Sequence, residues 1–62
     1  MTKEERAFLL EAREVLEGLS ERLKSLIERA KAEGREDLRE ELEAMAKETG
    51  LQLEIIEEGI GE

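Results

Sequence analysis

The sequence has no cysteine, no histidine and no proline, and Phe8 is its only aromatic residue. Without cysteine the chain cannot form a disulfide. Without cysteine and histidine it also lacks the usual ligands of zinc sites and the common pairs of nucleophile and general base. We therefore expect no enzyme: no catalytic residues, no metal site, no cofactor and no small-molecule substrate.

The remaining polar residues form no recognised motif. The five glycines stand alone, so none belongs to a phosphate-binding loop. The acidic clusters lack the spacing of a calcium-binding loop. We interpret Ser20 and Ser25 as solvated helix positions, and the acidic clusters as solvated faces or complements of helix dipoles.

Acidic residues dominate the charge, with 18 Asp and Glu against 10 Lys and Arg, for a formal net charge of -8. Such a chain repels phosphate backbones and anionic lipid surfaces, so neither nucleic acid nor a membrane is an expected partner. The charged start leads into no long apolar run, which predicts neither a signal peptide nor a membrane span. We expect a soluble protein, cytoplasmic by default.

A chain of 62 residues is expected to form one domain, residues 1–62. Domains this short bury only about 60% of the surface that their unfolded chains expose, so their stability is marginal. Because disulfides and zinc are excluded, oligomerisation or very regular packing must supplement the core.

The first predicted element is a helix over about residues 3–33. Thr2 and Glu5 have the spacing of a capping box, and Gly34 stands where a left-handed glycine closes a helix. The apolar residues of this segment fall in one arc about 120° wide. They are Phe8, Leu9, Ala12, Val15, Leu16, Leu19, Leu23, Leu26, Ile27 and Ala30.

A second, antiparallel helix is predicted over about residues 36–48, with Glu36 and Asp37 at the positive end of its dipole. Its apolar face is predicted at positions with the 4, 3 and 4 spacing of one helix face: Leu38, Leu42, Met45, Ala46 and Thr49. At about 20 Å, this helix would cover only residues 19–30 of the first stripe.

The pattern after Gly50 changes to alternation, because Leu51, Leu53 and Ile55 are separated by Gln52 and Glu54. Alternation predicts a half-buried strand over about residues 51–57, followed by a short tail, residues 58–62. The predicted fold class is therefore α+β: a helix–helix–strand protomer whose sheet is completed between subunits.

A single strand and a half-covered helix both need a partner. The strand leaves backbone groups unpaired, and the N-terminal half of the first helix leaves an apolar stripe uncovered. Strand pairing over residues 51–56 across a two-fold axis would satisfy both needs. The predicted interface consists of Phe8, Leu9, Ala12, Val15, Leu16, Leu51, Leu53, Ile55 and Ile56.

The regular connectors at residues 32–38 and 46–51 join segments rich in Glu, Leu, Ala, Lys and Arg. In this agreement of propensity, pattern and turn residues, the chain resembles de novo designed proteins, and in particular the subunits of designed cyclic homo-oligomers. The resemblance implies a self-assembling homo-oligomer, most simply a dimer, without catalytic activity.

Two alternatives stay open at this point. The chain could be a designed or natural binding module that offers its strand or first helix to a different protein. It could also be a natural acidic inhibitor that mimics nucleic acid, whose binding to a basic target would weaken with added salt.

Overall fold

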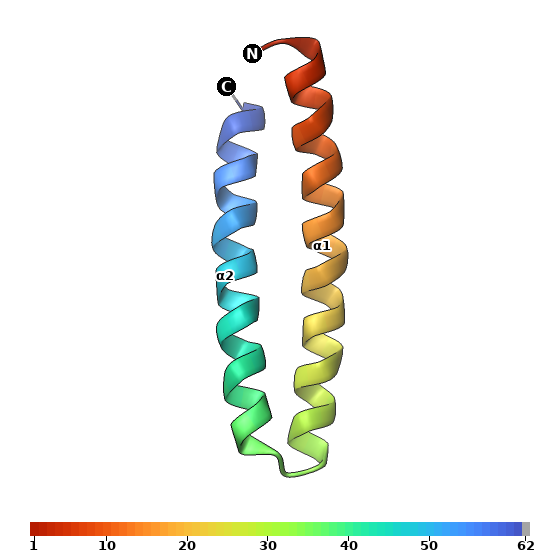
Figure 1. Ribbon diagram of the computed structural model, residues 1–62, viewed down its shortest axis with the longest axis vertical. Coiled ribbons are helices and arrows are strands. Elements are labelled where there is room, and N and C mark those ends of the chain that lie inside the picture. The colour runs from red at the N-terminus through yellow and green to blue at the C-terminus, as the bar shows by residue number, and fades with distance from the viewer. Residues whose placement is uncertain (62) are drawn as a thin grey trace.

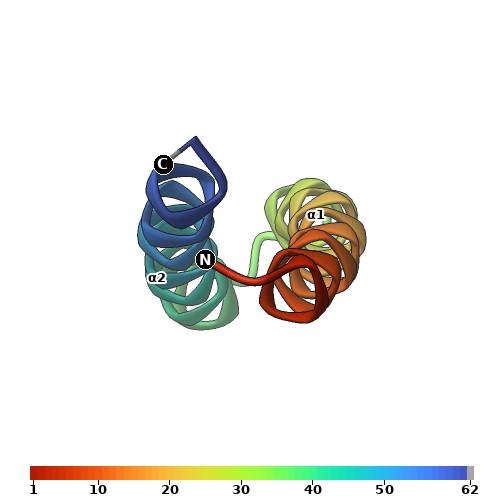
Figure 2. The same cartoon turned by 90° about the horizontal axis from the view of Figure 1, so that it is seen from above.

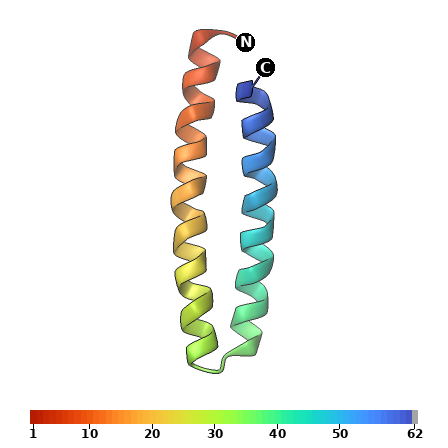
Figure 3. The ribbon, with the colours of Figure 1, turned by 180° about the vertical axis from the view of Figure 1, so that it is seen from behind.

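The protein is a hairpin of two long antiparallel helices. The computed structural model describes residues 1–61 and contains α1 (Lys3–Ala32) and α2 (Glu36–Gly61), joined by a short turn. The hairpin is 47 Å long (Figures 1 and 3). Seen from above, the two helices lie side by side, and no third element within residues 1–61 covers either face (Figure 2).

The predicted start and end of the first helix are confirmed. The Thr2 hydroxyl accepts a hydrogen bond from the Glu5 backbone N–H at 3.1 Å, which caps α1. At the other end Gly34 has a φ of +70°, and its N–H donates to the Lys31 carbonyl. The Arg35 N–H donates to the Ala30 carbonyl at 2.9 Å. These two bonds form a Schellman motif, in which glycine adopts the left-handed conformation without steric cost.

The predicted strand is wrong. Residues 51–57 continue α2, as do residues 58–61 of the predicted tail, and no strand occurs within residues 1–61. The fold class is thus a helical hairpin and not an α+β protomer. Only Glu62, the last residue of the predicted tail, lies outside the described residues.

Helix continuation past Gly50 pairs the backbone of this segment and covers part of the apolar stripe of α1. A helix pairs its backbone groups within itself, whereas a lone strand leaves them unpaired. The 26 residues of α2 reach about 39 Å at 1.5 Å per residue, so α2 runs along nearly all of α1. Thr49, Leu53, Ile56 and Ile60 recur at spacings of 4, 3 and 4, and this helical period prevails over the alternation.

The two helices meet along one seam of residues spaced alternately by 4 and 3. This spacing is typical of helices that pack at a small crossing angle. Leu23 and Ala30 are the only apolar residues of the seam with less than a tenth of their surface exposed. The core of the hairpin is therefore thin. The seam residues are Leu9, Arg13, Leu16, Ser20, Leu23, Ile27 and Ala30 of α1 and Leu42, Ala46, Thr49, Leu53, Ile56 and Ile60 of α2.

Thr49 is the one buried polar residue in the described part of the chain, with 5% of its surface exposed. Its hydroxyl donates to the Met45 carbonyl one turn earlier at 2.9 Å. This bond within the helix satisfies the hydroxyl without a partner on α1. Thr49 was predicted as an apolar face position, and it does face the seam.

Candidate interaction surface

One side of the hairpin carries a row of large apolar residues that the two helices leave uncovered. Their exposed fractions range from 40% to 73%. We call this row the apolar face. It consists of Phe8, Val15, Leu19 and Leu26 of α1 and Leu38, Met45 and Ile55 of α2.

Helix geometry places all seven residues on the same side. On each helix they are rotated by about 80° to 130° from the seam, in the same rotational sense along the chain. Because the helices are antiparallel, rotation in the same sense on both helices brings both rows to one side of the hairpin. Leu26 of α1 and Leu38 of α2 illustrate this, since both line one hollow with Ala30 and Leu42.

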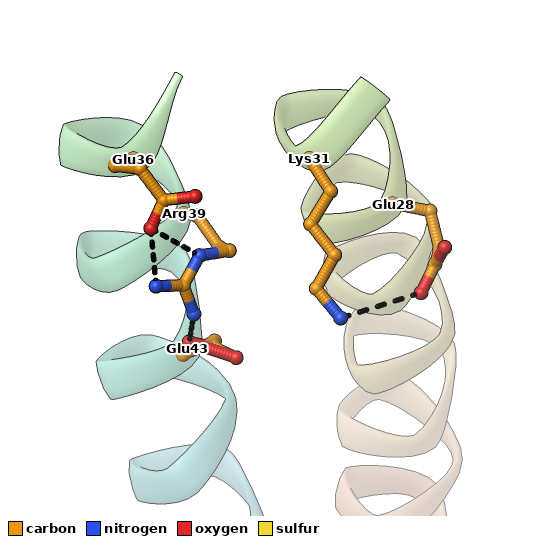
Figure 4. A network of polar contacts seen from close by, with 5 residues as sticks. All are labelled: Glu28, Lys31, Glu36, Arg39 and Glu43. Atoms are coloured by element: carbon orange, nitrogen blue, oxygen red, sulfur yellow. Dashed lines mark hydrogen bonds and ion pairs between the residues drawn. The ribbon is translucent and has the colours of Figure 1, made fainter. Parts of the chain in front are cut away.

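The opposite side of the hairpin is polar. Arg13 pairs with Glu17 at 3.4 Å on α1. On α2, the guanidinium of Arg39 lies between Glu36 and Glu43 and contacts both carboxylates (Figure 4). The only large exposed apolar side chain on this side of α1 is Leu10, with 37% of its surface exposed.

The Arg39 cluster favours the charged form of a carboxylate on α2. The Nε of Arg39 donates to Glu36 Oε2 at 3.0 Å. This hydrogen bond, with the positive charge of Arg39, lowers the pKa of Glu36 below its ordinary value. Figure 4 also shows the neighbouring pair Lys31–Glu28 on α1, whose charged atoms are 3.9 Å apart. These pairs place opposite charges side by side on the polar side.

The nine predicted interface residues are divided between three places. Leu9, Leu16, Leu53 and Ile56 lie in the seam, and Ala12 is half-buried at its edge. Phe8, Val15 and Ile55 lie on the apolar face, whereas Leu51 is exposed on the side of α2 that points away from α1. The structure therefore brings together only part of the predicted set.

Four members of the apolar face were not in the predicted interface. Leu19 and Leu26 were expected to lie beneath the second helix, yet they are 42% and 44% exposed. Leu38 and Met45 were recognised as one helix face, but this face was assumed to be covered by the first helix. Extending the 4 and 3 spacing of α2 through Ile60 would have shown that other residues occupy the seam.

Comparison with protein-family models, with curated proteins and with solved structures gave no match. Within residues 1–61, neither helix is long and apolar enough to cross a membrane.

Proposed function

We propose that this chain is a self-associating module whose apolar face packs against a second copy to give a four-helix bundle. The observation that carries the proposal is the apolar face itself, in which seven large side chains from both helices are at least 40% exposed. Soluble monomers rarely expose a continuous apolar surface of this kind. A short chain without disulfides gains the stability that it needs by covering that surface.

The angular position of the apolar face supports a bundle of four helices. In such a bundle each helix contacts two neighbours that lie roughly at a right angle to one another. The seam of each helix faces the first neighbour within the hairpin. The apolar face, rotated by about 80° to 130° from the seam, points toward the position of a second neighbour.

Association in this proposal is by helix packing, because the strand that was expected to pair is part of α2. The absence of catalytic activity and the designed origin stay predictions from the sequence. A different protein is the competing occupant of the apolar face, and the mass of the protein in solution separates the two occupants.

The test is the mass in solution of the wild type and of two matched variants. We expect the wild type to have the mass of two chains in sedimentation equilibrium or light scattering at micromolar concentration. Leu19→Lys places a charge on the apolar face and should shift the mass to one chain. Leu10→Lys is the control, because Leu10 is similarly exposed but lies on the polar side.

A wild type that has the mass of one chain up to about 100 µM would refute self-association, and the apolar face would then be assigned to a different protein. Equal weakening by both substitutions would refute the apolar face as the contact surface. Circular dichroism at low concentration shows whether each variant still forms the hairpin.

A further inference from the structure

We infer that two hairpins pack with their turns at the same end, so that α1 of each copy lies on α2 of the other. In this arrangement the partner's Glu48 pairs with Arg22 and the partner's Glu41 pairs with Arg29. The inference rests on the proposed self-association and adds the orientation of the two copies and the residues that set it.

The charged residues beside the apolar face carry this inference. On α1, Phe8 and Val15 are followed at the same seven-residue spacing by Arg22 and Arg29. On α2, Ile55 is preceded at that spacing by Glu48 and Glu41. Each helix thus has an edge that is apolar toward the termini and charged toward the turn. The charge is positive on α1 and negative on α2.

These edge charges are available for a partner. Arg22, Arg29, Glu41 and Glu48 are all exposed. Within residues 1–61, Arg22, Glu41 and Glu48 form no ion pair. Arg29 contacts only Glu33, in an exposed pair at 3.1 Å. On the polar side, in contrast, Arg13, Lys31 and Arg39 are each paired within the chain.

The register of the hairpin sets the levels at which these edges can meet. Leu9 lies level with Gly59, where an added Cβ would be 3.4 Å from Leu9 Cδ1. At the other end, α1 stops at Ala32 and α2 starts at Glu36, on either side of the turn. Both pairs of residue numbers sum to 68, so residue i of α1 lies level with residue 68 minus i of α2.

A two-fold axis parallel to the helices keeps every residue at its level and places α1 against the partner's α2. At three positions the levels of the facing residues then differ by only about two residues, or 3 Å. The facing pairs are Val15 with the partner's Ile55, Arg22 with the partner's Glu48, and Arg29 with the partner's Glu41. Apolar residues meet apolar residues, and each arginine meets a glutamate. By symmetry the dimer contains four such ion pairs.

A two-fold axis perpendicular to the helices gives a poorer match. It places the turns at opposite ends and sets α1 against the partner's α1. The edge of α1 has only positive charges and that of α2 only negative charges, so no opposite charges would face each other. Arg22 and Arg29 would instead lie near the partner's Val15 and Phe8, which leaves arginine beside apolar side chains.

The first test reverses the charges of one edge. R22E/R29E should weaken dimerisation about 100-fold, because each of four reversed pairs is worth a factor of about three. The matched control is K24E/K31E, which changes the net charge equally on the same helix but at positions on the polar side. It should weaken dimerisation far less than R22E/R29E does.

Mixing two charge-reversed variants gives the complementary result. R22E/R29E and E41R/E48R should each dimerise poorly alone, because each has two edges of the same sign. Their mixture should dimerise like the wild type, since every interchain pair is then restored. Equal weakening by R22E/R29E and K24E/K31E, or a mixture that stays monomeric, would overturn the proposed pairs.

The second test measures orientation directly. The chain has no cysteine, so A32C provides one spin-label site, at the exposed last residue of α1. With the turns at the same end, the two labels should be about 25 Å apart, across the bundle. With the turns at opposite ends, they would be about 40 Å apart along it.

The two failures are distinguishable. A dimer with the longer label distance would overturn the orientation and leave the proposed self-association intact. A labelled chain with the mass of one chain and no measurable label-to-label distance would overturn both the orientation and the self-association.

Discussion

Replacement of Gly50 by alanine tests whether α2 is continuous past Gly50, where the alternating sequence pattern predicted a strand. Gly50 lies in the interior of α2, and its φ is not in the left-handed region. A methyl group there would meet no atom within 4 Å. The change therefore acts through helix propensity alone, and Gly50→Ala should stabilise the protein by about 1 kcal/mol. If Gly50 instead ended a helix, alanine would destabilise the protein by a similar amount.

The measurement is urea unfolding followed by circular dichroism, at one protein concentration for all variants, because association contributes to stability. In thermal unfolding, the same gain of about 1 kcal/mol would appear as a rise of about 4–8 °C in Tm. Gly18→Ala is the positive control, since Gly18 is also inside a helix with open space around it. Gly34→Ala is the opposite control, because its φ of +70° strains an alanine. A loss of stability with Gly50→Ala, similar to that with Gly34→Ala, would refute a continuous α2.

Two further predictions concern polar groups of α2. Thr49→Val should change the free energy of unfolding by less than about 1 kcal/mol, because the hydroxyl bonds only within its own helix. Thr49→Ser should lower the free energy of unfolding by about 1 kcal/mol, because a buried methyl group is lost. Urea unfolding measures both, and a larger loss with valine than with serine would contradict the assigned role of the hydroxyl. Because Arg39 lowers the pKa of Glu36 in the folded state, their interaction stabilises the protein above the ordinary glutamate pKa and is lost as the pH falls through the lowered value. The unfolding free energy of Arg39→Gln should therefore fall less than that of the wild type between pH 7 and pH 3, and equal losses would show that the Arg39 cluster does not stabilise the fold.

Local sequence signals determined the ends of α1 and the start of α2. The Thr2 cap, the left-handed Gly34 and the acidic residues Glu36 and Asp37 act over three or four residues. Such signals depend on hydrogen bonds and dipoles within one turn of helix, so they are readable without knowledge of the fold. The excess of acidic residues and the lack of cysteine and histidine are likewise properties of composition.

Tertiary structure decided the conformation of the chain after Gly50 and the choice of apolar residues that stay exposed. The segment of residues 51–56 fits both patterns, since Leu51, Leu53 and Ile55 alternate as in a strand, whereas Leu53 and Ile56 continue the helical spacing that begins at Thr49. Packing along the N-terminal half of α1 favours the helix. A helical segment pairs its own backbone groups and also covers Leu9 and Leu16. The same packing selects one of two apolar rows on each helix for the seam. The other row becomes the apolar face, and periodicity alone does not distinguish the two rows.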